Sequence, residues 1–369
     1  MKLINKISKA FAVITVALLS FSCENDTENV IEKYPTISEI LEKNATNDYS
    51  VLIKALKATQ LYSITANSGS YTLFAPNNAA FSAYSSTNIP LGTLVESTDF
   101  TTLTTTQLNE LKRVLMNHFV VTGTLLADLP AEGYIKTYSP FGTSTSIGLS
   151  AFIKKNTDIT INGGTTNGGT KITSGDSNAG NGVIHYVESV MKLPTLVSTI
   201  TANPNLSTLL SVVTNPAQTA VLAQVATPAS NTQIFAPNNA AFTTALATGG
   251  YLDGKTDTEK TKVLRYHLVT SGSFTQTAVV GTSTGNINNG ASTATSFLPT
   301  SATTDATVTT RQNITGSTTV FQTFRIEKNS VKIFENPAIT SPASNIRTVN
   351  IHTSNGIIHI IDRVLQPVL

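Results

Sequence analysis

The stretch Tyr71-Thr-Leu-Phe-Ala-Pro-Asn-Asn-Ala-Ala-Phe81 decides the fold of this chain, because it occurs twice. Its second copy is Thr232-Gln-Ile-Phe-Ala-Pro-Asn-Asn-Ala-Ala-Phe242. The eight residues Phe-Ala-Pro-Asn-Asn-Ala-Ala-Phe are identical at 74–81 and 235–242. Chance is a poor explanation for an identity of this length within one chain, so the sequence contains an internal duplication.

Each copy predicts a strand, a stop and a helix. Residues 71–74 alternate and are rich in β-formers, which is typical of a strand. Pro76 cannot donate to a strand ladder, so we expect the strand to end there. Asn77 or Asn78 can then accept from the free N–H groups of a helix that starts near Ala79. Apolar residues at helical spacing are usually core, so we interpret the block as a folding device, with a ligand-facing turn as the alternative.

Three further pairs of segments recur in the same order in both halves of the chain. They are Pro35-Thr-Ile37 with Pro194-Thr-Leu196, Arg113-Val-Leu-Met-Asn-His-Phe-Val-Val-Thr-Gly123 with Lys262-Val-Leu-Arg-Tyr-His-Leu-Val-Thr-Ser-Gly272, and Asn181-Gly-Val-Ile-His-Tyr-Val-Glu-Ser-Val-Met191 with Asn355-Gly-Ile-Ile-His-Ile-Ile-Asp-Arg-Val-Leu365. The ordered set resembles the fasciclin-type (FAS1) domain family. That family's pattern is a Phe-Ala-Pro-x-x-x-Ala-Phe block, a Tyr-His pair at a helix end and a terminal Asn-Gly-x-Ile-His-x-Ile-Asp-x-Val-Leu strand. The resemblance covers residues 34–193 and 194–369, which we take as two domains.

The resemblance implies an α+β fold with two tandem fasciclin-like domains, each a β-strand wedge or sandwich flanked by helices. It also implies a non-enzymatic protein without a cofactor, which takes part in the cell-surface interaction commonly called adhesion. The junction at Leu193-Pro194 leaves almost no linker, so we expect a fairly rigid tandem.

The Tyr-His pair of the family supplies candidate interaction residues, because this region is linked to receptor binding in some members and is structural in many. The pair is Tyr266-His267 in the second copy and Asn117-His118 in the first, which departs from the pattern at Asn117. Capping boxes at 104–107 and 256–259 predict the helices that end at these two pairs. A histidine at a helix C-terminus can bond to free carbonyl groups, so a buried, hydrogen-bonded histidine is the alternative.

The first residues form a targeting segment rather than part of the fold. Three lysines precede an apolar run at 10–19 that is too short to span a bilayer. The run leads into Leu19-Ser-Phe-Ser-Cys23, which resembles a loose bacterial lipoprotein signal. We therefore predict a signal peptide at 1–22 and lipid attachment at Cys23, with an ordinary signal-peptide cysteine as the alternative.

An acidic stretch, Glu24-Asn-Asp-Thr-Glu28, follows within a tether at 23–33. It resembles the export signals with which some Gram-negative bacteria place lipoproteins on the cell surface, and a solvated tether is the alternative. The predicted location is the outer membrane of a Gram-negative bacterium, with the chain exposed at the cell surface and held by its lipid anchor only. Because Cys23 is the single cysteine, no intramolecular disulfide can form.

The charge balance excludes nucleic acid as a partner. Removing residues 1–22, which hold three lysines and no acids, takes the formal charge from +2 to −1. No basic stripe is left to bind phosphates. Charged residues make up 12% of the chain, about half of the usual share, and Thr, Ser, Asn and Gly take their place. This composition suits a β-rich extracytoplasmic surface that bonds through hydroxyls and amides.

The sequence shows no credible catalytic or metal site. Gly281-Thr-Ser283-Thr-Gly285 matches the nucleophile-elbow pattern, but that motif needs a helix after the serine, and turn-like residues follow here. Residues 176–182 are rich in oxygen ligands yet lack the closing glutamate of an EF-hand loop, which leaves a weak calcium site as an alternative. None of the five histidines lies at i, i+4 spacing to another, so no zinc pair is visible. We predict no catalytic residue, no metal and no cofactor.

The two copies differ most in residues 281–318, a segment of the second copy rich in Gly, Thr, Ser and Asn. We look there first for specific binding, with Phe297, its only aromatic residue, as a candidate contact; a mobile surface loop is the alternative. The expected partners are an extracellular protein or polysaccharide, and outer-membrane proteins. A second hypothesis is therefore a surface glycan-binding accessory protein of an outer-membrane polysaccharide-uptake system, although the chain has no tryptophan.

Overall fold

The computed structural model describes residues 34–44, 48–85, 94–142, 144, 146–227, 232–269, 274–275, 306–313, 321–326, 332–335 and 343–369. The chain divides into two compact units, Met1–Pro35 and Thr36–Leu369, and both copies of the duplicated block lie in the second. The predicted signal peptide at 1–22, Cys23, Ser283 and Phe297 lie outside the described residues. Within the described part of the chain, no helix is both long enough and apolar enough to cross a membrane.

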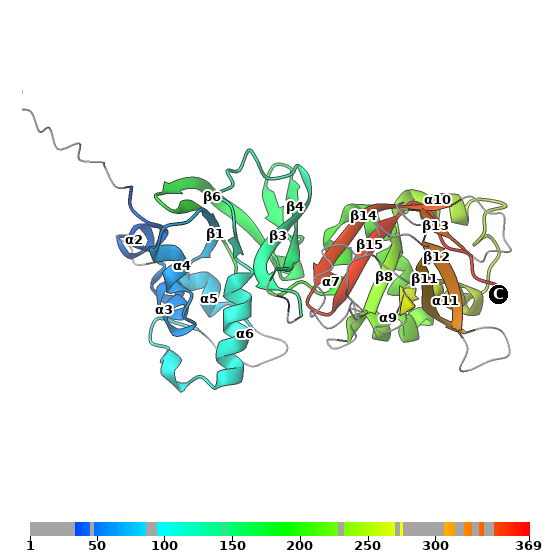
Figure 1. Ribbon diagram of the computed structural model, residues 1–369, viewed down its shortest axis with the longest axis horizontal. Helices are drawn as coiled ribbons and strands as arrows, with labels where there is room; N and C mark the ends of the chain where they lie inside the picture. The colour runs from blue at the N-terminus through cyan, green and yellow to red at the C-terminus, as the bar shows by residue number, and fades with distance from the viewer. Residues whose placement is uncertain are drawn as a thin grey trace, which may run out of the picture. The chain divides into compact units, whose positions relative to one another are not determined.

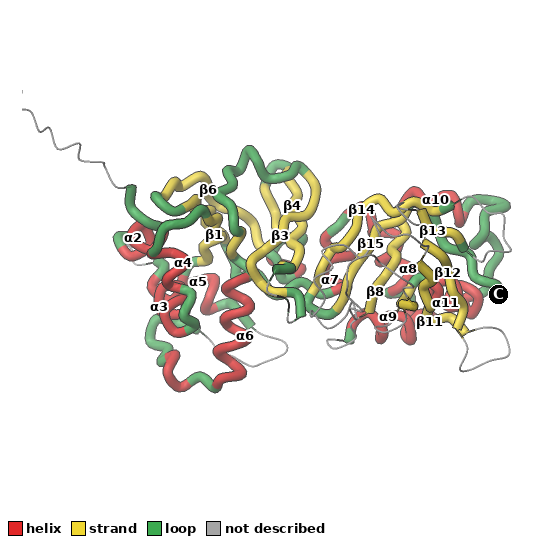
Figure 2. The backbone as a smooth tube through the Cα atoms, in the orientation of Figure 1, coloured by secondary structure: helices red, strands yellow, loops and turns green. Residues whose placement is uncertain are grey.

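The first repeat places its helices together on one side of its strands (Figures 1 and 2). Its elements are α2 (Ile37–Glu42), α3 (Ser50–Ala58), α4 (Tyr62–Ala66), β1 (Tyr71–Pro76), α5 (Asn78–Ser82), η1 (Phe100–Thr102), α6 (Thr105–Met116), β2 (Phe119–Val120), β3 (Glu132–Pro140), β4 (Gly148–Lys155), β5 (Ile159–Ile161), η2 (Thr165–Asn167), β6 (Thr170–Ala179) and β7 (Gly182–Val187). The described strands form one sheet in the order β2-β1-β7-β6-β5-β4-β3.

The second repeat follows the same plan. Its elements are α7 (Leu196–Ala202), η3 (Pro204–Leu206), α8 (Ser207–Val213), η4 (Pro216–Gln218), α9 (Thr219–Ala226), β8 (Thr232–Pro237), α10 (Asn239–Leu246), α11 (Asp257–Tyr266), β9 (Leu268–Val269), β10 (Phe274–Thr275), β11 (Ala306–Asn313), β12 (Phe321–Ile326), β13 (Lys332–Phe334), β14 (Ser344–Thr353) and β15 (Gly356–Ile361). The described strands form a sheet in the order β10-β11-β12-β13-β14-β15-β8-β9. Strand β11 lies within 281–318, so part of that segment is a sheet strand rather than a loop. The predicted α+β architecture is confirmed in both repeats.

Each sheet contains one parallel strand pair, which lies next to a short edge strand. Strand β1 runs parallel to β7, with Leu73 opposite Ile184, and β8 runs parallel to β15, with Ile234 opposite Ile358. Every residue of β8 and β15 is buried. Strands buried on both faces have nearly continuous apolar sequences, as β15 does. Pro76 makes the last pairing of β1, so the predicted stop is confirmed.

The first asparagine of the duplicated block caps the helix that follows it. Asn77 Oδ1 accepts from the N–H of Ala80 at 2.8 Å, at the start of α5. Asn238 Oδ1 accepts from the N–H of Ala241 at the same distance, at the start of α10. Each bond satisfies one of the N–H groups that a helix leaves free at its first turn.

The second asparagine of the block serves a different helix. Asn78 Oδ1 accepts from the N–H of Val51 at 3.0 Å, in the first turn of α3. Asn239 Oδ1 accepts from the N–H of Thr208 at 3.0 Å, in the first turn of α8. One asparagine pair therefore fastens two helices to the end of one strand. This geometry supports the interpretation of the block as a folding device.

Each repeat has two apolar clusters, one on each side of its parallel strand pair. In the first repeat, the cluster on the helical side includes Leu56, Phe81 and Leu115, and the cluster inside the sheet includes Phe74 and Ile153. In the second repeat the two clusters are built around Phe242 and around Phe235 with Phe324 respectively. The two phenylalanines of each duplicated block thus point into opposite cores, because the block passes from strand to helix between them.

A buried asparagine joins the beginning of each repeat to its end. Asn355 Oδ1 accepts from the N–H of Leu196 at 2.8 Å, and its Nδ2 donates to the carbonyls of Val225 and Thr227 at 3.1 Å. In the first repeat Asn181 makes the equivalent bonds to residues 37, 65 and 67. An amide offers both a donor and an acceptor, so one side chain can satisfy backbone groups of both kinds.

We expect Asn355→Ala to lower the free energy of unfolding by about 2–3 kcal/mol, because it leaves buried backbone groups of Leu196, Val225 and Thr227 without partners. Urea unfolding followed by circular dichroism measures this loss. Asn156 is exposed, and Asn156→Ala is the matched control, with an expected change below about 0.5 kcal/mol. Equal losses in the two variants would show that the bonds of Asn355 contribute nothing specific.

Candidate functional site

The four candidate interaction residues lie where two helices end, and all four are buried. Helix α6 ends with Asn117 as its C-cap, followed by His118. Helix α11 ends at Tyr266, with His267 as its C-cap. The capping boxes predicted at the starts of these helices are both present. The exposed fraction of each of the four side chains is at most 2%.

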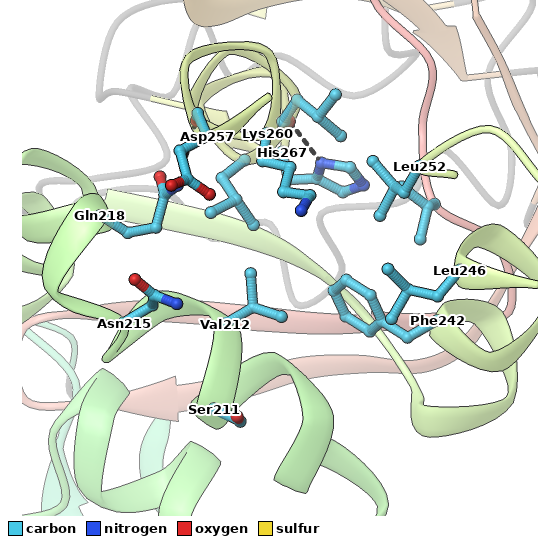
Figure 3. A pocket seen from close by; sticks show the side chains of 13 residues that line it. Ser211, Val212, Asn215, Gln218, Phe242, Leu246, Leu252, Asp257, Lys260 and His267 are labelled. Carbon is cyan, nitrogen blue, oxygen red and sulfur yellow. Dashed lines mark hydrogen bonds between the residues drawn. The ribbon is translucent and has the colours of Figure 1, made fainter. Parts of the chain in front are cut away.

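His267 is held by both of its ring nitrogens. Its Nδ1 lies 2.8 Å from the carbonyl oxygen of Val263, a bond drawn as a dashed line in Figure 3. Its Nε2 accepts from the N–H of Leu365 at 2.9 Å. These partners assign the neutral tautomer with the proton on Nδ1. The side chain therefore ties the end of α11 to the segment that follows β15.

His118 repeats this arrangement in the first repeat. Its Nδ1 lies 2.8 Å from the carbonyl oxygen of Val114, and its Nε2 accepts from the N–H of Met191 at 2.9 Å. Burial lowers the pKa of His118 and of His267 to about 4, so both rings are neutral at pH 7. The geometry matches the buried, hydrogen-bonded histidine considered above. A role in partner binding stays a prediction and has to act through the position of neighbouring residues.

The first repeat has Asn117 where the second has Tyr266, and the two side chains have different hydrogen-bond partners. Asn117 Oδ1 accepts from the hydroxyl of Thr137 in β3 at 3.0 Å, and its Nδ2 donates to the carbonyl of Lys192 at 3.2 Å. In the second repeat Tyr266 donates its hydroxyl to the carbonyl of Thr323 in β12 at 2.8 Å. Burial raises the pKa of Tyr266. Both residues thus connect the helix end to the sheet.

A pocket of about 150 Å³ opens next to His267 on the helical side of the second repeat. It is lined by Ser211, Val212, Asn215, Gln218, Phe242, Leu246, Leu252, Asp257, Lys260, Val263, Leu264, His267 and Val364. Figure 3 shows Asn215, Gln218 and Asp257 on one side and Phe242, Leu246 and Leu252 on the other. Helices α8, α10 and α11 and the short η4 contribute most of these residues, so the pocket belongs to one repeat alone.

The polar side of this pocket has two engaged amides, Asn215 and Gln218, and two charged groups. Gln218 is buried; its Nε2 donates to the carbonyl of Asp257 at 3.2 Å, and its Oε1 accepts from the hydroxyl of Thr261 at 2.7 Å. Asp257 and Lys260 add one charge of each sign to the lining. On the apolar side Leu246 is 45% exposed. The arrangement can hold an apolar side chain and orient a polar group beside it.

The segment that precedes α11 is shorter than its counterpart before α6. In the first repeat, the longer segment before α6 places Leu94 and Phe100 in the core on the helical side, and η1 packs on α3. The second repeat supplies Leu252 to its core from the shorter connection between α10 and α11. Helix α11 packs instead on α9 and η4. The pocket residues could not be recognised from the sequence, because Phe242 and Leu246 lie at a helical spacing that is typical of buried core residues.

The segment considered for calcium forms the end of a hairpin between β6 and β7. Asp176 Oδ1 accepts from the N–H of Leu126 at 2.7 Å, so one of its oxygens serves the backbone. Across the described ranges, no three His, Cys, Asp or Glu residues are placed to hold a metal ion together.

The comparisons with known proteins agree with the duplicated architecture. The sequence model described as "Fasciclin domain" matches residues 47–194 and 204–367. "Protein sll1483" of Synechocystis sp. (strain ATCC 27184 / PCC 6803 / Kazusa) is 30% identical over 159 residues, which cover 43% of this chain and 74% of that protein. A solved FAS1 domain pair from the insect cell adhesion molecule fasciclin I aligns with 86% of this chain and 95% of its own, at 14% identity and a TM-score of 0.45. Since the domain model matches both repeats over most of their length, the chain belongs to the fasciclin domain family as a tandem pair.

Proposed function

We propose that this protein is a non-enzymatic adhesion protein of the cell surface, and that its second repeat binds an extracellular protein partner through the pocket beside His267. Fasciclin I, whose domain pair aligns with this chain, is described as a cell adhesion molecule. The proposal includes a lipid anchor at Cys23 in the outer membrane of a Gram-negative bacterium, which rests on the sequence of residues 1–28.

The observation that carries the proposal is the exposed Leu246 on the apolar side of the pocket. Burying a leucine side chain and filling the pocket with an apolar side chain of the partner would each contribute about 1.5–3 kcal/mol. Asp257 and Lys260 lie in the same lining, where charges affect partner choice and association rate more than affinity. A small apolar anchor site with a polar edge is typical of protein recognition.

The bonds of His267 argue against general base catalysis at this pocket. Both ring nitrogens of His267 are engaged with the backbone, so the ring has no free lone pair to accept a proton from a substrate. The wall that faces it is made of Phe242, Leu246 and Leu252, which carry no chemistry of their own. These features support binding rather than turnover.

We expect Leu246→Gln in the full-length protein to reduce cell–cell adhesion about 10-fold or more, since it replaces the exposed apolar contact with a polar one. Aggregation of cells that display each variant measures the effect. Val121 in the first repeat is 55% exposed, and Val121→Gln is the matched control with unchanged adhesion.

Cys23→Ser should release the protein from the membrane and abolish adhesion. Unchanged adhesion of the Leu246→Gln variant would contradict the role of the pocket. A Cys23→Ser protein that stays bound to the membrane would contradict the lipid anchor at Cys23.

The glycan-binding accessory role in polysaccharide uptake stays a second prediction. Its predicted contact, Phe297, lies outside the described residues, so the structure adds nothing to that part of the hypothesis.

A further inference from the structure

A second site lies between the two repeats, in a groove of about 570 Å³. The groove is lined by β3 and β4 of the first repeat and by residues from the start of the second repeat and from β14. Several hydrogen bonds cross between the repeats here; among them, Lys136 Nζ donates to the carbonyl of Asn350 at 2.8 Å, and the N–H of His352 donates to Ser150 Oγ at 2.9 Å. Both repeats fall in the compact unit Thr36–Leu369.

We propose that this groove binds an acidic saccharide, a sugar ring that carries a carboxylate. The proposal goes beyond the adhesive function above, because it assigns a separate site and a different class of ligand. It rests on the cations that line the groove, on an aromatic wall and on an amide oxygen that has no hydrogen-bond partner among the described residues.

The first cation is Lys136, whose ammonium has neutral neighbours. Its Nζ contacts Ser150 Oγ at 2.8 Å, the carbonyl of Asn350 at 2.8 Å and Nδ1 of His352 at 2.7 Å. Burial and the charge of Lys136 lower the pKa of His352 to about 3, so that ring is a neutral acceptor. Desolvation lowers the pKa of Lys136 to about 8, which leaves it charged at pH 7. None of the described contacts of this ammonium is a carboxylate, so its charge attracts an anion in the groove.

The second cation is Arg347, on β14. Its Nε and Nη2 bond to Oδ2 of Asp362 at 2.9 and 2.7 Å, and its side chain is 62% exposed. Within the described residues these bonds leave Nη1 for a ligand, and a guanidinium prefers carboxylates. Arg347 and Asn350, whose carbonyl holds Lys136, both line the groove from β14, so the two cations lie at the same wall. Glu132 is the one acidic residue in the lining, and it accepts from Asn205.

The wall of the groove offers a ring surface. Tyr134 is half-buried, and its ring lies 5.0 Å from that of Phe152, which backs it from the sheet. The hydroxyl of Tyr134 accepts from Nδ2 of Asn203 at 2.9 Å, a bond that fixes the ring across the repeats. Aromatic faces can pack against the apolar face of a sugar, while the amides around them bond to its hydroxyls.

Asn350 supplies the observation that most directly indicates a ligand. It has a left-handed backbone with φ of 55°, at a bulge of β14, and its Oδ1 is buried without a hydrogen-bond partner in the described part of the chain. In the first repeat Asp176 has the corresponding backbone, with φ of 58°, and its Oδ1 accepts from the N–H of Leu126. Buried acceptors are rarely left unpaired, so a ligand hydroxyl is a natural donor for Asn350.

Calorimetric titration of the full chain carrying Cys23→Ser tests the proposal, with digalacturonate as the acidic probe and galactobiose as its neutral counterpart. We expect saturable binding of digalacturonate that weakens with added salt, and at least 10-fold weaker binding of galactobiose. Arg347→Gln should weaken digalacturonate binding about 10-fold. Asn350→Gly keeps the left-handed backbone accessible and should weaken it about 5-fold.

The controls separate this site from the pocket beside His267 and from loss of folding. Arg113 pairs with Glu110 in the first repeat, so Arg113→Gln removes an arginine elsewhere and should bind like the parent. Leu246→Gln should also bind digalacturonate normally, whatever it does to adhesion. The thermal midpoint of each variant is measured alongside. No saturable binding of digalacturonate up to about 10 mM overturns the proposal, as does equal binding of galactobiose or undiminished binding by a folded Arg347→Gln chain.

Discussion

Replacing His267 by alanine is expected to lower the free energy of unfolding by about 3–5 kcal/mol. The change leaves the carbonyl of Val263 and the N–H of Leu365 without partners in a buried site, and it opens a cavity. Such a loss is a large part of the stability of a typical domain. Urea unfolding, followed by the fluorescence of tyrosines and by circular dichroism, measures it.

Two further variants show whether the loss comes from the bonds of the ring. His118→Ala removes the equivalent bonds in the first repeat and should cost a similar amount, about 3–5 kcal/mol. His267→Gln keeps a side-chain acceptor for Leu365 and should lose less than the alanine variant. A loss below about 1 kcal/mol in both alanine variants would contradict the structural role assigned to these histidines.

Acidification should unfold the protein between pH 6.5 and pH 4. His118 and His267 have pKa values of about 4 in the folded chain, against 6.5 for an exposed histidine. Between these values the unfolded chain binds more protons than the folded one, so stability is complete above pH 6.5 and falls as the pH drops toward 4. At 1.36 kcal/mol for each pKa unit, each ring accounts for about 3 kcal/mol of this loss. Chemical unfolding at a series of pH values measures the slope.

Glu335 opposes this effect in the second repeat. Burial raises the pKa of Glu335 to about 7, against 4.5 when exposed, so the folded chain gains stability from this group as the pH falls from 7 to 4.5. Burial also lowers the pKa values of His352 and His359 in this repeat to about 3, so Glu335 offsets only part of the acid loss there. His118→Gln is the matched variant, with lower stability at pH 7 but a flatter slope below pH 6.5. A free energy of unfolding that stays constant from pH 7 to pH 4 would contradict the prediction.

The Tyr-His pair and its counterpart Asn117-His118 have a structural role in this chain. The family resemblance gave Asn117, His118, Tyr266 and His267 as candidate interaction residues, and the structure buries all four. A variant that removes one of them would lose binding through misfolding, whether or not a partner touches the helix end. Leu246, which is exposed and lines the same pocket as His267, is the more informative residue for a binding experiment.

Much of the fold could be predicted from the sequence, because local patterns determine it. The strand that stops at Pro76, the cap at Asn77 and the capping boxes at 104–107 and 256–259 depend on residues within a few positions of one another. Duplication of the block at 235–242 then predicted that the second half repeats the first. The long segment 281–318 was the exception, because its polar composition concealed strand β11.

The sequence alone determined the duplication, since it follows from the identity of two local segments, and the resemblance of those segments to a domain family implied the α+β class. The tertiary structure decided the sites. Whether Leu246 lies in a core or at a pocket depends on how far apart α8 and α11 lie, which no helical pattern records. Lys136 and His352 are 216 positions apart and meet only through the packing of the two repeats. Contacts at such separation depend on the packing of whole sheets and helices, and the identity of neighbouring residues does not specify them.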